Sequence, residues 1–152
     1  MKTVFSNDQI RSVFLAQSQA HGRTSNSSQY FEGNVMFSYG SHYTLAVIKG
    51  NTLLVSKRNS SVTTNSHNSA LRYDAQRAGF TVIEVENVNA QSLEDHKANA
   101  ADMVEQSEQL KASAKRRRKE SYKEMDLSDA AQKEADVVRY AGVFSSDLEK
   151  AA

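Results

Sequence analysis

Two Gly-Asn dipeptides set the strongest constraint on the fold of this chain. Gly33-Asn34 separates the apolar runs 29–32 and 35–39, and Gly50-Asn51 separates the runs 43–49 and 52–57. Glycine takes the positive φ of a type II′ turn without steric cost, so each dipeptide predicts a tight β-hairpin. With one more strand expected over 80–86, the chain should form a four- or five-stranded, mainly antiparallel sheet.

Helical patterns flank the hairpins. A capping box of Ser6 and Gln9 predicts a helix over 6–19, and the polar segment 21–28 that follows is expected to be a loop. A second helix is predicted over 65–78, packed on one face of the sheet with the first helix beside it. These elements place the chain in the α+β class.

The candidate N-caps of the second helix are Thr63 and Thr64, and the residues just before it, 61–63, have the pattern of a short strand. After residue 90 the composition changes to strong helix formers. We expect an α+β domain over 1–90 and a helical extension over 91–152, with one helix over 91–125 and a last helix capped by Ser128.

A concentrated basic segment lies between residues 111 and 123. It holds seven basic residues and one acid, a net charge of +6, whereas the whole chain has a net charge of +1. Consecutive cations on a helix surround it and form no single stripe. The segment also lacks an apolar face, so we expect an exposed helix or a disordered arm that becomes ordered on binding. The candidate nucleic-acid-binding residues are Lys111, Lys115, Arg116, Arg117, Arg118, Lys119 and Lys123.

This charge distribution favours nucleic acid, DNA or RNA, as the partner. Cations that reach phosphates and displace counterions need no exact spacing, so binding would not read sequence. The alternative is a module that binds a host or phage protein and inhibits or modifies a host factor, such as a defence system, and a solvated face without any partner is the third interpretation. Val137, Tyr140 and Phe144 share one face of the last helix and give a possible homo-oligomer interface.

Signals for catalysis or metal binding are weak. Thr64 and His67 have the spacing of a minimal nucleophile–base pair, with Asp74 further along the helix, but helix capping is the favoured interpretation because no oxyanion loop lies nearby. The four histidines show no metal-site spacing, and the chain has no cysteine, which is typical of a reducing cytoplasm. We expect no enzyme activity, no cofactor, no metal, no membrane segment and a cytoplasmic location.

Four short segments have a distinctive order. They are GRTS at 22–25, YFEGN at 30–34, FSYGSH at 37–42 and SVTTNSH at 61–67. Together they resemble an uncharacterised family of small proteins of bacteriophages and other mobile elements, over about residues 20–75. The resemblance implies a phage-type accessory protein in the cytoplasm of an infected bacterium, with no activity to carry over. It singles out Arg23, Tyr39, His42, Thr64 and His67 as residues to test, whose other role would be to fix turns and caps.

Overall fold

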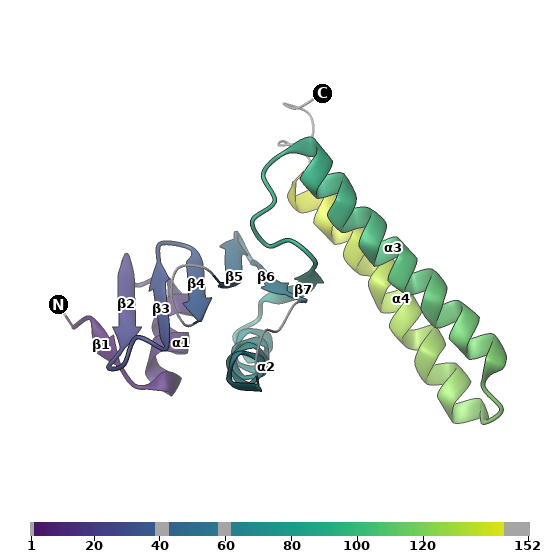
Figure 1. Ribbon diagram of the computed structural model, residues 1–152, viewed down its shortest axis with the longest axis horizontal. Coiled ribbons are helices and arrows are strands. Elements are labelled where there is room, and N and C mark those ends of the chain that lie inside the picture. Colours follow the sequence, from purple (N-terminus) through teal and green to yellow (C-terminus); the bar gives the residue numbers. More distant parts are fainter. Residues whose placement is uncertain (1, 39–42, 58–61, 145–152) are drawn as a thin grey trace. The chain divides into compact units, whose positions relative to one another are not determined.

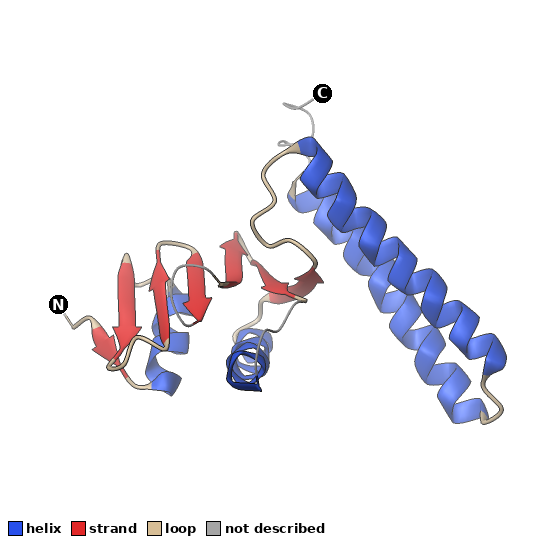
Figure 2. Cartoon of the chain, viewed as in Figure 1, coloured by secondary structure: helices blue, strands red, loops and turns tan. Residues whose placement is uncertain are grey.

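The computed structural model describes residues 2–38, 43–57 and 62–144, without the side chains of 62–65 (Figure 1). The chain divides into two compact units, Met1–Asn89 and Ala90–Ala152. Figure 2 shows that the strands belong to the first unit and that the second is made of helices. Each unit is therefore described by itself.

The first unit is a sheet with two helices. Its elements are β1 (Val4–Phe5), α1 (Asn7–Ala16), β2 (His21–Thr24), β3 (Gln29–Glu32), β4 (Val35–Ser38), β5 (Thr44–Lys49), β6 (Thr52–Ser56), α2 (Val62–Arg77) and β7 (Thr81–Val85). The strands lie side by side in chain order. The pairs from β2 to β6 are antiparallel, whereas β1 pairs with β2, and β6 with β7, in parallel.

The α+β class is confirmed, but the expected strand number is wrong. The described residues form a seven-stranded sheet, because β1 and β2 add an edge that the sequence pattern did not reveal. The residues of β2 fall in the segment expected to be a loop. Their side chains alternate between exposed and buried, with Gly22 and Thr24 buried. The exposed residues are polar and the buried residues are small, so the segment lacks the apolar pattern by which a strand is recognised.

The two Gly-Asn turns form as expected. Glu32 pairs with Val35 across Gly33-Asn34, and Lys49 pairs with Thr52 across Gly50-Asn51. Gly33 and Gly50 have φ of +57° and +59°, which side chains with a Cβ rarely adopt. The turns therefore fix the register of both hairpins.

One face of the sheet packs against both helices. Phe14 of α1 and Leu71 of α2 are fully buried in one apolar cluster with Phe31, Met36 and Leu53 of the strands. The rings of Phe14 and Phe31 lie 5.5 Å apart between centroids. This cluster holds α1 and α2 on the same side of the sheet.

The helices of this unit differ from the expectation at their ends. The capping box of Ser6 and Gln9 is present. However, α1 ends at Ala16, because Gln17 takes the left-handed conformation with φ of 50°. Helix α2 begins at Val62, so Thr63 and Thr64 lie inside it, and no strand forms over 61–63 within the described residues.

The second unit is an antiparallel helical hairpin, α3 (Leu93–Arg116) and α4 (Glu120–Val143). The helix formers over 91–125 belong to two helices, because Arg117 takes an extended conformation and the chain reverses there. Ser128 consequently lies inside α4 and does not cap it. The buried seam is unusually polar, with His96, Asn99, Met103, Ser107 and Ala114 on α3, and Asp126, Ala130, Asp136 and Tyr140 on α4. None of the described helices is both long and apolar enough to span a membrane.

Candidate nucleic-acid interface

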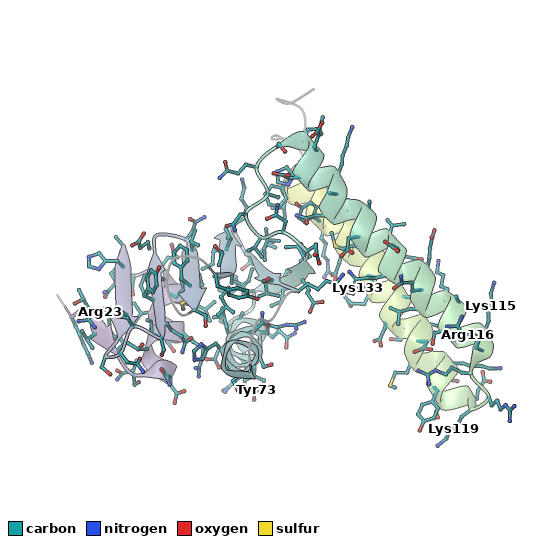
Figure 3. The ribbon with its side chains drawn as sticks, in the orientation of Figure 1. Arg23, Tyr73, Lys115, Arg116, Lys119 and Lys133 are labelled. Atoms are coloured by element: carbon teal, nitrogen blue, oxygen red, sulfur yellow. The ribbon has the colours of Figure 1, made fainter. Side chains whose placement is uncertain are left out.

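The basic segment forms the closed end of the α3–α4 hairpin. Lys115 and Arg116 end α3, residues 117–119 make the reversal, and Lys119 is the N-cap of α4. All residues from 115 to 120 are exposed. We call residues 115–119 together with Tyr122 the hairpin tip; Figure 3 shows Lys115, Arg116 and Lys119 at this end of the two helices.

Two of the candidate cations pair across the seam. Nε of Arg117 donates to Oδ2 of Asp126 at 3.2 Å, and Ser113 Oγ donates to the same oxygen at 2.7 Å. Lys111 forms an ion pair with Glu134, which also accepts a hydrogen bond from Ser107. These two basic residues thus hold the helices together.

Hydrogen bonds within the hairpin lower the pKa of both carboxylates. The hydrogen bond from Ser113 is the largest cause for Asp126, and the hydrogen bond and charge of Arg117 and the charge of Arg116 add to it, against the opposite effect of burial. For Glu134 the hydrogen bond from Lys111 comes first, followed by that from Ser107. Both groups are therefore carboxylates at neutral pH.

The remaining candidate cations are exposed, except that Lys123 is partly buried. Lys123 approaches Glu120 of the same helix at 4.0 Å, which is long for an ion pair. Within the described part of the chain, Lys115, Arg116 and Arg118 have no ion-pair partner. Lys111 and Arg117 form ion pairs with Glu134 and Asp126, and the other basic residues of the tip form a cluster of exposed cations.

Tyr122 supplies an aromatic surface to the tip. Its side chain is 46% exposed. The Lys119 ammonium lies 5.1 Å from the ring centroid, and the Arg117 guanidinium lies 5.6 Å from it. Cations at these distances are attracted to the ring and keep positive charge beside an accessible aromatic face.

Two of the three residues of the expected homo-oligomer interface are not a free surface, and the third, Val137, is half-buried. Tyr140 and Phe144 are 1% and 6% exposed, and both rings pack against His96 of α3. The Tyr140 hydroxyl lies 2.7 Å from His96 Nδ1 and accepts a hydrogen bond from Asn99. These side chains pack α4 against α3, so the apolar face of the last helix is covered within the same unit.

Of the residues that the family resemblance singled out, the structure describes the side chains of Arg23 and His67, which lie on β2 and α2. Tyr39 and His42 lie outside the described residues, as does the side chain of Thr64. Arg23 is exposed on β2, where its guanidinium donates to the carbonyls of Thr24 and Ser25. His67 is buried on α2.

His67 belongs to a buried polar cluster that joins α2 to the sheet. Its Nδ1 lies 2.9 Å from the hydroxyl of Ser38 on β4. Burial lowers the pKa of His67, and the positive charge of Arg11 lowers it further, so the ring is neutral at pH 7. Nearby, Asn68 donates to the Ser56 carbonyl of β6.

The Thr64–His67 arrangement therefore gains no support as a catalytic pair. Asp74, the acid on the same helix, accepts a 2.6 Å hydrogen bond from Arg11 of α1. The described residues contain no group of three His, Asp or Glu side chains placed to hold a metal ion. These polar contacts instead join α2 to the sheet and α1 to α2.

Sequence reasoning missed one aromatic pair. The rings of Tyr30 and Phe37 stack with centroids 4.8 Å apart on β3 and β4. The signal for it was present, because a two-residue turn at Gly33-Asn34 places residues 30 and 37 directly opposite each other.

Comparison with known proteins adds no assignment. No protein-family model matches this chain, and neither a curated protein nor a solved structure matches it.

Proposed function

We propose that this chain is a non-catalytic, phage-type accessory protein that binds nucleic acid through the hairpin tip. The observation that carries the proposal is the concentration of exposed cations at one end of a helical hairpin. Five consecutive basic residues, 115–119, span the end of α3 and the reversal, and one of them, Arg117, pairs with Asp126. The phage setting rests on the resemblance of residues 20–75.

The shape of the tip suits a phosphate backbone. A hairpin end is narrow, and its cations point in several directions, so several phosphates can be contacted at once. Helix α4 begins beside Lys119 without a side-chain hydrogen bond at its N-cap, although the Tyr122 amide already donates to the Lys119 carbonyl. Contacts with phosphates give affinity that depends on salt and is independent of base sequence.

Salt-dependent binding of a short duplex by the full chain tests the proposal. Arg116→Ala with Arg118→Ala removes two exposed tip cations that have no ion pair within the described residues. We expect weaker binding and a salt slope reduced by about 1.8, since each phosphate contact in B-DNA contributes about 0.9.

A matched control uses the opposite end of the same hairpin. Lys97→Ala with Arg139→Ala also removes two exposed cations, so the net charge falls equally. We expect this control to keep nearly all of the affinity. Equal loss in both variants would indicate general charge attraction, and no loss in the tip variant would reject the proposed interface.

Binding of a host or phage protein through the hairpin is the second candidate function. The observation that favours it is the exposure of apolar side chains on the helices, with Leu127 at 51%, Met125 at 56% and Val138 at 73%. Capture of a protein from nuclease-treated lysate by the full chain, lost on Leu127→Glu with Val138→Glu, would support this function. Sedimentation over a concentration series separates it from self-association.

A further inference from the structure

The first unit carries an aromatic surface on the sheet face that points away from α1 and α2. On β3, Gln29 and Phe31 are fully buried toward α1, so Tyr30 between them faces the other way. On β4, Met36 lies in the core and Ser38 reaches His67 of α2, so Phe37 between them also faces away. Both rings are partly exposed.

A cation flanks this pair across the sheet. Arg23 of β2 is the register partner of Tyr30, which in turn pairs with Phe37. Gly22 and Thr24 are buried on either side of Arg23, which is exposed. The strands β2, β3 and β4 therefore present a guanidinium and two stacked rings in one row. Figure 3 shows Arg23 over this end of the sheet.

A hollow of about 400 Å³ lies beside the row. It is lined by His21, Arg23, Tyr30 and Glu32 and also by Gly22 and Phe31 of the buried side, so it lies at the β2–β3 edge of the row and Phe37 is not among its lining residues. These groups include donors and acceptors, as the edge of a nucleobase requires. The volume is within the range of pockets that hold small ligands, about 300–1,000 Å³.

We infer that Tyr30, Phe37 and Arg23 form a stacking platform for unpaired bases, so that the protein prefers single-stranded over double-stranded nucleic acid. An aromatic ring stacks on the face of any base, and arginine attracts the neighbouring phosphate. In a duplex those base faces are covered by adjacent base pairs. The inference rests on the proposed function and adds the substrate class.

A tryptophan reporter tests the platform directly, because the chain has no tryptophan. Phe37→Trp is the platform reporter, and Tyr122→Trp is the tip reporter. Tyr73→Trp is the control reporter, since Tyr73 is 60% exposed on α2. Each full-length variant is titrated with oligothymidylate of about 15 nucleotides and with a blunt duplex, and binding is followed separately by anisotropy of the labelled strand.

We expect the single strand to quench the fluorescence of the platform reporter and to leave that of the control reporter unchanged. The duplex should leave the platform reporter unchanged. Saturable binding of the single strand without a change in the platform reporter would overturn the platform.

The tip reporter separates the two proposals. If it is quenched while the platform reporter does not respond, the hairpin-tip proposal stands alone. If the platform reporter responds and the tip reporter does not, the tip proposal fails. Quenching of the platform reporter by a soluble oligosaccharide but not by oligothymidylate would assign the platform to carbohydrate and overturn the inference.

A second variant guards against a local change caused by tryptophan. Tyr30→Leu with Phe37→Leu keeps the apolar surface and removes both rings. We expect its affinity for the single strand to fall about tenfold, and its affinity for the duplex to stay unchanged. Unchanged affinity for the single strand in a variant that melts cooperatively would also overturn the inference.

Discussion

Nε of Arg117 donates to Oδ2 of Asp126 across 3.2 Å, and this contact divides the basic segment into two roles. Arg117 lies at the reversal between α3 and α4, and Asp126 is 10% exposed in the seam. An arginine that satisfies a nearly buried carboxylate contributes to folding. Its neighbours Arg116 and Arg118 have no such contact within the described residues, so their charges remain exposed to solvent.

Asp126→Asn should separate hairpin stability from binding. The change weakens the contacts with Ser113 and Arg117, so the melting temperature of the helical signal should fall by several degrees. It also releases Arg117, so affinity for nucleic acid should stay equal or increase. Thermal circular dichroism and a binding titration measure the two effects.

Asp129→Asn is the matched control, because Asp129 is exposed one turn away on α4. It removes the same charge from the chain without altering the seam. If both variants melt alike, the Arg117–Asp126 contact has no structural role.

Tyr140→Phe should destabilise the other end of the hairpin. The change removes the hydroxyl that contacts His96 and Asn99 while keeping the ring that packs on Phe144. Leaving buried polar groups without this partner should cost about 1–3 kcal/mol of unfolding free energy. Denaturant titration measures this loss, and Tyr122→Phe at the exposed tip should show almost none.

The sequence predicts the parts of this fold that short-range chemistry determines. The turns at Gly33 and Gly50 fix two hairpins, and Ser6 with Gln9 fixes the start of α1. Prediction from the sequence fails where packing between distant segments determines the structure. Residues 116–119 are all helix formers, yet the helix breaks there, because reversal lets α4 bury Tyr140 against α3.

The candidate site shows the same division. Composition identifies the basic segment, since charge needs no fold to be counted. It cannot tell Arg117 from Arg116, because that difference depends on which side chain reaches Asp126. The Tyr30–Phe37 pair follows from the turn register, but its exposure depends on which face of the sheet α1 and α2 cover.

Gly22→Ala should destabilise the sheet unit. A Cβ at Gly22 would lie 2.8 Å from Phe31 Cε1 and 3.0 Å from Phe5 Cε2, so the rings must shift from their packed positions. We expect a loss of about 1–3 kcal/mol, as for overpacking in a core. Gly142→Ala is the control, since a Cβ there meets nothing within 4 Å and should stabilise α4 by about 0.5–1 kcal/mol. Equal effects in denaturant titrations would contradict the close approach at Gly22.

The two units should lose stability in different pH ranges. Because the pKa of His67 is lowered by burial and by Arg11, the unfolded chain binds a proton at higher pH than the folded chain. The stability due to His67 is therefore full above its ordinary pKa of 6.5 and is lost as the pH falls through the lower pKa of the folded state. Asp126 and Glu134 also have lowered pKa values, but from ordinary values of 3.8 and 4.5, so their contribution to the hairpin is lost only at lower pH.

Hydrogen exchange followed by mass spectrometry, corrected for the intrinsic effect of pH, resolves the two ranges. Peptides from α2 should lose protection first on acidification, and peptides from α3 and α4 should follow at lower pH. His67→Gln removes the titrating group. Protection of the α2 peptides should then no longer fall in the first pH range, and the loss of protection in α3 and α4 at lower pH should not change. Simultaneous loss of protection in both units, or a first range that persists in His67→Gln, would show that another group controls the acid response of the sheet unit.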